Sequence, residues 1–384
     1  MNNILGFGIY IVAQQIVLMP IISRILPEIE FSRVSIYISI FAILTNVFGS
    51  ELGIVRQVLS EKCKSCSDYN LILLQLIPIV GLLSYLLLNF FGFKSIDIVA
   101  LTLCIYLGNL RLYTASLFRL NHDFKKIVYQ NLLYLIGVVL GLIFMTYWRF
   151  VFLPFLFAEL FCFFYGFFYC DFSFKKIEKT NQHSLIVNKF LDFGSISLLV
   201  NLASYFDRLI IYPILGANAV AIYFATSSMS KVISLITNPL HGVILSWLKG
   251  DDLEFRDRVI QNLIKISVPL VLFVFIISLP ITYISVRIFY PIYLNDALYI
   301  MMPICVGVAF SSMSSIVKGV LLKYVDSKKL IHSYLIYIFI LVIFGGFFSF
   351  YYGLVGFSIS TALANIALSF SFYFLLNRTV RHSI

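Results

Sequence analysis

Runs of about twenty apolar residues recur along the whole chain and alternate with short polar segments. Each run can cross the ~30 Å hydrocarbon core of a bilayer as an α-helix, and the sequence lacks the alternating ten-residue segments of membrane β-barrels. The pattern therefore predicts an all-α integral membrane protein. We place about twelve spans near residues 4–23, 34–55, 71–91, 96–118, 127–148, 150–170, 187–212, 219–247, 263–287, 297–322, 331–351 and 353–376.

The composition agrees with this pattern. Hydrophobic residues make up 61% of the 384 residues and charged residues only 12%, with a mean hydropathy of +0.97. Such values lie outside the range of soluble globular domains. The longest polar connection, residues 171–186, is too short for an extramembrane catalytic domain. Only "MNN" precedes the first span, without the basic segment of a signal peptide, so we expect that span to be a helix of the mature protein.

The basic residues are concentrated in alternate loops. With a cytoplasmic N-terminus, most of the 28 Lys and Arg residues fall in the C-terminal tail or in cytoplasmic loops at 56–64, 119–126, 175–179, 249–258 and 323–329. This positive-inside distribution predicts that both termini of this multi-pass protein are cytoplasmic. It accounts for most of the net charge of +10, and it argues against a continuous nucleic-acid-binding surface.

The chain also contains an internal repeat. "DFKKIVYQNLLY" at 123–134 and "DSKKLIHSYLIY" at 326–337 share the Asp, both Lys, a Leu and the final Tyr. A fainter echo links "RILPEIEFSRVSIY" after the first span with "PILGANAVAIY" after the seventh. An offset of six spans preserves orientation, so we expect two six-helix lobes around a central cavity, related by an axis along the membrane normal. The lobes would be residues 1–170 and 187–384, joined by a cytoplasmic linker at 171–186. The alternative is that a basic helix start arose twice by chance.

In the seventh and eighth predicted spans, the apolar segment "NLASYFDRLIIYPILGANAVAIYFATSSMSK" carries Asp207, Arg208 and Lys231. Charges inside a membrane are costly unless they face a partner or a hydrated interior. Asn201, Ser204 and Arg208 share one stripe of a helix, which we expect to face the lumen. Asp207 points about 100° away from Arg208 and is expected to contact a neighbouring helix. Lys231 falls near the predicted membrane midplane.

These residues form the predicted site. The predicted substrate-binding residues are Lys231, Arg208, Arg111, Arg24, Lys318, Asn201 and Ser204. For Arg208, snorkelling to lipid headgroups is the alternative. The predicted coupling residues or structural ion-pair partners are Asp207, Glu51 and Glu159, which either pair with lumen cations or bind a coupling proton.

The cysteines indicate no metal site. Four of the six lie in apolar spans, where a free thiol behaves as a small hydrophobe. Cys63 and Cys66 form a single C-x-x-C pair, and neither a second Cys pair nor a His pair lies near in sequence to complete four zinc ligands. We therefore expect no metal and no cofactor.

Three segments of the sequence resemble one family, and the resemblance covers essentially the whole chain. They are "SRILPEIEFSRVSIYISIFAILTNVFGSELGIVRQVLSE", "FDRLIIYPILGANAVAIYFATSSM" and "YYGLVGFSISTALANIALSFSFYFLL". They resemble the Wzx-type oligosaccharide flippases of the multidrug/oligosaccharidyl-lipid/polysaccharide exporter superfamily. The most recognisable stretch is Asp207-Arg208 followed by the Leu215-Gly216 turn. The first turn departs from the pattern, because Leu26 is followed by Pro27 and Glu28 instead of Gly.

The resemblance implies a function. A Wzx-type flippase moves undecaprenyl-pyrophosphate-linked sugar repeat units, such as those of O-antigen lipopolysaccharide, across the bacterial inner membrane by alternating access. It implies a lipid-linked oligosaccharide as substrate, membrane lipids as surroundings and H⁺ or Na⁺ as coupling ion. The polysaccharide polymerase and the chain-length machinery would be its protein partners.

Two other classes stay open. A membrane polysaccharide polymerase or glycosyltransferase can also be basic with many helices, but such enzymes carry long outer loops, and the outer loops predicted here are short. A multidrug or small-ion antiporter of the same fold would favour carboxylates over Lys and Arg inside the membrane, contrary to the basic residues of this chain.

Overall fold

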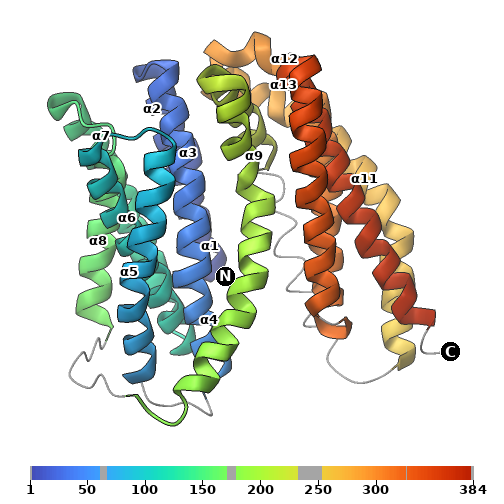
Figure 1. Cartoon of the computed structure of the whole chain (residues 1–384), viewed down its shortest axis with the longest axis horizontal. Helices are drawn as coiled ribbons and strands as arrows, with labels where there is room; N and C mark the ends of the chain where they lie inside the picture. Colours follow the sequence, from blue (N-terminus) through green and yellow to red (C-terminus); the bar gives the residue numbers. More distant parts are fainter. Residues whose placement is uncertain (1, 61–66, 171–178, 232–252, 326, 382–384) are drawn as a thin grey trace. The chain divides into compact units, whose positions relative to one another are not determined.

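The computed structural model describes residues 2–60, 67–170, 179–231, 253–325 and 327–381 (Figure 1). All regular secondary structure within these ranges is helical. The described chain forms two compact units, which are Met1–Tyr205 and Phe206–Ile384.

Unit 1 begins with two long, irregular helical rods. The first consists of α1 (Asn2–Ile11), a π-helical segment η1 (Val12–Leu18) and α2 (Met19–Ile25). The second consists of α3 (Glu28–Leu44), the π-helical segment η2 (Thr45–Ser50) and α4 (Glu51–Val58). Leu26 adopts an extended conformation between the rods, as expected for a residue before a proline.

Four antiparallel helices complete most of unit 1. They are α5 (Ser67–Phe90), α6 (Ser95–Leu120), α7 (Phe124–Trp148) and α8 (Leu153–Tyr169). Arg149 ends α7 in the left-handed conformation, at φ 53°. α7 packs closely on α8 in this group, because a Cβ at Gly137 would lie 2.5 Å from the Ala158 Cα. Glycine at this position therefore lets the two backbones touch.

The remaining helices are long and two of them are kinked at glycine. α9 (His183–Lys231) changes direction at Gly216, where φ is 83°, and α13 (Ser327–Arg381) changes direction at Gly353, where φ is 57°. Glycine takes such positive φ values without steric cost. Between them lie α11 (Leu253–Phe289), the short 3₁₀ segment η3 (Pro291–Tyr293) and α12 (Leu294–Tyr324).

Nine helical stretches within the described ranges are long and apolar enough to cross a membrane. Two of them, in α9 and α13, contain the glycine kinks and each provides two of the predicted spans. The shorter apolar helix α8 coincides with the sixth predicted span. The prediction of an all-α membrane protein with about twelve spans is confirmed, except that the second part of the eighth span, at 232–247, lies outside the described residues.

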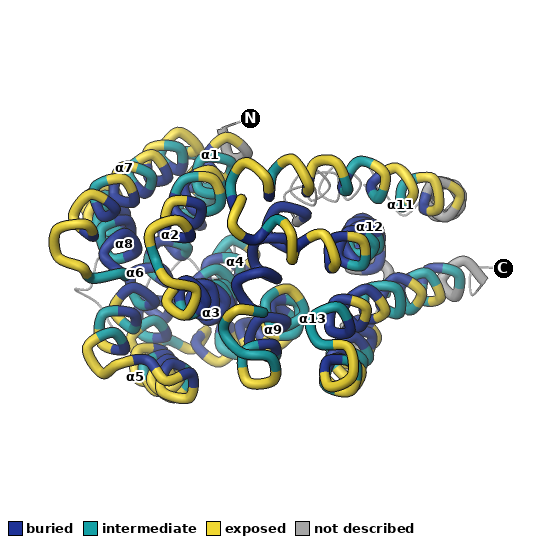
Figure 2. The backbone as a smooth tube through the Cα atoms, turned by 90° about the horizontal axis from the view of Figure 1, so that it is seen from above, coloured by how far each residue is buried: buried dark blue, intermediate teal, exposed yellow. Residues whose placement is uncertain are grey.

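Burial differs strongly between helices of unit 1. Most residues of α3 are buried, whereas many apolar side chains of α5 are exposed, as the dark and yellow tubes of Figure 2 show. Exposed leucines and phenylalanines on a helix this apolar indicate a surface that faces lipid. Within unit 1, the second rod is therefore largely internal, whereas α5 lies at the periphery.

The first part of α9 belongs to unit 1. The boundary between the two units falls within α9, after Tyr205. Two contacts explain this assignment. The Asn46 amide donates a hydrogen bond of 2.7 Å to Asn201, and Thr180 is bonded through its backbone N–H and its hydroxyl to the buried carboxylate of Asp68. The predicted lobe boundaries themselves stay a prediction.

Candidate functional site

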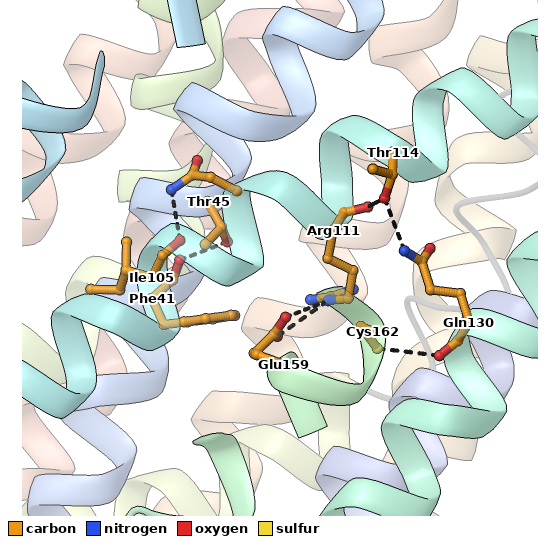
Figure 3. Close-up of polar contacts among 9 residues, drawn as sticks. Phe41, Thr45, Ile105, Arg111, Thr114, Gln130, Glu159 and Cys162 are labelled. Carbon is orange, nitrogen blue, oxygen red and sulfur yellow. Dashed lines mark hydrogen bonds and ion pairs between the residues drawn. The ribbon is translucent and has the colours of Figure 1, made fainter. Parts of the chain in front are cut away.

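An ion pair lies buried in the middle of unit 1. Arg111 of α6 donates from Nε to both carboxylate oxygens of Glu159 on α8, at 3.0 and 3.2 Å (Figure 3). The two side chains are only 5% and 1% exposed. Removing one partner of such a pair would leave an uncompensated buried charge, at a cost of about 3–5 kcal/mol.

Aromatic rings enclose the arginine. The Arg111 guanidinium lies 4.7 Å from the ring centroid of Tyr10 on α1 and 5.2 Å from that of Tyr134 on α7. The two rings are 4.8 Å apart. Tyr10, Arg111, Tyr134 and Glu159 form what we call the N-cluster, which joins α1, α6, α7 and α8.

A chain of hydrogen bonds supports the N-cluster from behind. Thr114 donates to the Arg111 carbonyl at 2.9 Å, Gln130 donates to the Thr114 hydroxyl at 2.9 Å, and the Cys162 thiol donates to the Gln130 carbonyl at 3.2 Å (Figure 3). These bonds join α6 to α7 and α7 to α8, whereas the ion pair joins α6 directly to α8. The orientation of Arg111 is thus determined by its own helix and by two neighbouring helices.

The π-helical segment η2 brings a second polar contact into unit 1. It widens the rod so that Glu51 N–H bonds to the carbonyl of Asn46, five residues earlier, and it presents Asn46 to Asn201. Gly49 of the same segment lies against the α6 backbone, since a Cβ there would fall 2.7 Å from the Asn109 Cα. π-bulges inside helices are frequent at functional sites.

Unit 2 contains a different buried polar group. Asp207 of α9 is 4% exposed and lies close to Tyr223, which is also near Thr361 of α13. Tyr337, also of α13, lies close to Asp207 and to Asn365. We call Asp207, Tyr223, Tyr337, Thr361 and Asn365 the C-cluster. It contains one carboxylate with two tyrosines close to it, and each tyrosine has a further polar neighbour on α13.

Arg208 lies next to the C-cluster along the chain but has other neighbours. It is 3% exposed, and its guanidinium lies 4.5 Å from the ring centroid of Phe224 and close to Tyr290. Its backbone N–H donates to Asp207 Oδ1 at 2.9 Å. A deeply buried guanidinium framed by aromatic rings is suited to hold a phosphate or carboxylate group.

The two units make matching contacts at positions that the repeat relates. Tyr37, at the end of the first copy of the fainter echo, packs edge-to-face on Phe155, with centroids 5.2 Å apart. Tyr223, at the end of the second copy, packs edge-to-face on Phe357, with centroids 5.6 Å apart. The first pair joins α3 to α8, and the second joins the later part of α9 to the later part of α13. This correspondence supports the internal repeat.

The other predicted residues have varied surroundings. Asn201 is buried and bonded to Asn46, whereas Ser204 is exposed and bonded to its own helix at Val200. The residues of the predicted polar stripe therefore do not share one environment. Arg24 is exposed at the end of α2 and Glu51 is half-buried at the start of α4.

Lys318 lies 5.8 Å from the Tyr334 ring centroid in unit 2. Lys231 is the last residue of α9, and its side chain lies outside the described part of the structure, as do Cys63 and Cys66. In the described ranges no group of three or more His, Cys, Asp or Glu residues could hold a metal.

Among the aromatic residues of the clusters, Tyr10 was not singled out by the sequence. Tyr10 lies in an ordinary apolar run, and nothing local distinguishes it from lipid-facing tyrosines. Tyr134 and Tyr337 did carry a signal, because they are the final matched tyrosines of the repeat. A residue retained in both copies is expected to serve both units.

No protein-family model and no curated protein matches the chain. Solved structures do match it. A lipid II flippase MurJ in an inward closed conformation aligns with a TM-score of 0.70 at 16% identity, over 97% of this chain and 85% of that chain. An inward-facing multidrug resistance MATE family transporter of the MOP superfamily aligns with a TM-score of 0.72 at 13% identity, over 99% of this chain and 98% of that chain. An outward-facing MATE transporter gives 0.65 at 14% identity. The chain therefore shares its fold with these membrane transporters.

Proposed function

We propose that the protein is a Wzx-type flippase, which carries undecaprenyl-pyrophosphate-linked oligosaccharide repeat units across the bacterial inner membrane by alternating access. Support comes from the similarity of the fold to the lipid II flippase over nearly the whole chain. The three segments of sequence that resemble Wzx-type flippases add to it.

The observation that carries the proposal is the buried Arg208. A lipid-linked sugar has a polar, anionic head that must cross about 30 Å of hydrocarbon, where an unpaired charge costs several kcal/mol. A carrier for it needs cations inside the membrane. Arg208 is such a cation, held between the Phe224 and Tyr290 rings in unit 2. We assign Arg208, together with Lys231 at the end of the same helix, to the pyrophosphate or to an acidic sugar of the substrate.

The N-cluster has a different role in this proposal. Arg111 is neutralised by Glu159 and enclosed by Tyr10 and Tyr134, so a substrate anion would have to compete with a buried carboxylate for it. The pair therefore serves best to hold α6 and α8 in register. Arg24, Lys318, Asn201 and Ser204 remain predicted contacts of the sugar or of the lipid headgroup.

The C-cluster is the proposed coupling site. Asp207 lies close to Tyr223 of α9 and Tyr337 of α13, so its carboxylate can bind H⁺, or Na⁺ together with a neighbouring hydroxyl oxygen. Coupling by either ion would bring a cation to Asp207 in one conformation and release it in the other. Replacing Asp207 by Asn would then abolish the dependence of transport on the ion gradient.

A bacterial strain without its own flippase tests the proposal. Expression of this chain should restore surface polysaccharide and reduce the lipid-linked repeat units that accumulate on the cytoplasmic face. Purified protein in proteoliposomes should then move a fluorescent undecaprenyl-pyrophosphate-linked oligosaccharide to the opposite leaflet. Failure of both, with the protein present in the membrane, would refute the proposal.

The second candidate is a multidrug antiporter. It is favoured by one observation, which is that the MATE transporter is matched over 98% of its length and the flippase MurJ over 85%. An antiporter would change the efflux of organic cations and leave surface polysaccharide unchanged. Measuring both readouts in the same strain separates the two candidates, and no effect on either would point to the polymerase or glycosyltransferase alternative.

A further inference from the structure

A groove runs along the outer side of unit 1 between α7 and α8. It measures about 400 Å³ and is open along one side. Its α7 wall is formed by Leu133, Ile136 and Leu140, and its α8 wall consists only of aromatic side chains, from Phe161 to Tyr169. The tyrosine hydroxyls are the only side-chain polar groups of this lining.

The contact between the two helices explains the shape of the groove. Next to the α7 wall stand Gly137 and Gly141, where a Cβ would fall 2.5 Å from the Ala158 Cα and 2.4 Å from the Pro154 Cα. The two backbones therefore touch along this line. Bulky side chains on either flank then rise above the point of contact and leave a trench between them, instead of the convex ridge that two ordinary helices present to lipid.

The groove has a basic end. Lys125 lies one turn before Tyr129 and two turns before Leu133, so it continues the α7 wall toward the start of the helix. Its side chain is exposed. The neighbouring Lys126 is already bonded to Asp123 at 2.7 Å and lies over the Phe118 ring.

The aromatic side of the groove reaches the same end. Tyr165 of α8 lies close to Tyr129 and Asp123. From Lys125 to Leu140 the face extends roughly 22 Å along α7, at 1.5 Å per residue. Along this face, a lysine comes first, tyrosine side chains follow, and the far end has only apolar side chains. The positive-inside rule predicts that the lysine is on the cytoplasmic side.

We propose that this groove binds the polyprenyl chain of the lipid-linked substrate, with the phosphate adjoining it at Lys125. The inference rests on the proposed function, since it names where the tail of that substrate is held. A single groove between two touching helices suits a carrier with one long chain better than a phospholipid with two. Branched, unsaturated chain segments pack well on aromatic rings, and an anionic phosphate complements an exposed lysine at the end where chain and headgroup meet.

A photo-crosslinking experiment tests the inference without measuring transport. The purified full-length protein in phosphatidylcholine nanodiscs is incubated with a polyprenyl phosphate that carries a diazirine in its chain. We expect the crosslinked peptides to come from residues 125–140 and 161–169. An excess of unlabelled polyprenyl phosphate should remove the signal, and an equal excess of phosphatidylglycerol should not.

Two pairs of variants make the test specific. Ile136→Trp fills the groove and should abolish labelling, whereas Val139→Trp, at a position of similar exposure on α7 outside the lining, should leave it unchanged. Lys125→Ala should weaken labelling about tenfold at low probe concentration, as expected for the loss of one charge-assisted contact. Lys189→Ala, which removes another exposed lysine of unit 1, should have no effect. Thermal unfolding of each variant identifies any that fails to fold.

Other results would overturn the inference or the proposed function separately. Full labelling of Ile136→Trp, or equal competition by phosphatidylglycerol, would show that the groove is not a polyprenyl site. If the wild-type protein moves lipid-linked oligosaccharide but is not labelled in the groove, only the inference fails. If the groove is labelled but no oligosaccharide moves in proteoliposomes, the proposed function fails.

Discussion

Tyr134 and Tyr337 occupy the same place in the two copies of the internal repeat, and each lies against the buried charged group of its own unit. Tyr134 stacks on Arg111, with 5.2 Å between the guanidinium and the ring centroid, and Tyr337 lies close to Asp207. The charged groups themselves are not related by the repeat. The two units have thus kept one aromatic position and acquired different ionisable partners beside it, which is consistent with a structural role in one unit and a coupling role in the other.

The first prediction concerns the Arg111–Glu159 pair. Arg111→Ala should destabilise the protein by about 3–5 kcal/mol, because the Glu159 carboxylate would remain buried without its partner. The double variant Arg111→Met with Glu159→Leu should recover most of this loss, since it removes both charges and keeps side-chain volume. Unfolding in detergent measures the difference. Equal destabilisation by the single and double variants would contradict the prediction.

The second prediction concerns Lys231. Lys231→Ala should lose most transport at an unchanged protein level, because a substrate anion would lose a cation near the membrane midplane. Lys231→Arg keeps the charge and should retain partial transport, although a forked guanidinium does not replace an ammonium fully. Surface polysaccharide in a strain without the native copy is the readout. Full activity of the alanine variant would reduce Lys231 to a structural residue.

The third prediction concerns Arg208. Arg208→Lys should retain part of the transport activity and Arg208→Gln almost none, if its charge holds the substrate. Both variants keep a long side chain beside Phe224. Measuring the apparent affinity for the lipid-linked oligosaccharide in proteoliposomes distinguishes binding from folding. Equal activity of the two variants would indicate that packing, and not charge, is what Arg208 provides.

The fourth prediction concerns helix packing. Gly137→Ala should destabilise the protein by about 1–3 kcal/mol, because the added Cβ meets the α8 backbone at Ala158. Gly346→Ala is the matched control, since nothing lies within 4 Å of a Cβ at that helical position. The control should be neutral or slightly stabilising, as alanine favours helix by up to about 1 kcal/mol. A Gly137→Ala variant as stable as the control would mean that α7 and α8 do not touch there.

The fifth prediction concerns topology. Cysteine or epitope tags inserted near Lys64, Lys126, Lys176, Lys249 and Lys328 should all be cytoplasmic, because these loops carry the excess of basic residues. Accessibility to a membrane-impermeant reagent in whole cells and in opened cells decides each position. A single tag found outside would break the twelve-span scheme.

The sequence alone determined the helical membrane character of the protein, the positions of nearly all spans and the glycine at the turn between the seventh and eighth. These features are local, since each apolar run must satisfy its own backbone hydrogen bonds in lipid by forming a helix. The sequence also identified charged residues inside apolar spans, among them Arg111, Glu159, Asp207 and Arg208.

Only the tertiary structure decided which of these residues meet. Arg111 and Glu159 are 48 positions apart, and Asn46 and Asn201 are 155 apart. Their pairing depends on how helices rotate and slide against one another, and a shift of one residue turns a side chain by about 100°. The π-helical segments produce such shifts, and the apolar pattern of the sequence does not predict them. Tyr10 is part of a buried site for the same reason, because it contacts Arg111 and Tyr134 only when α6 and α7 pack against α1.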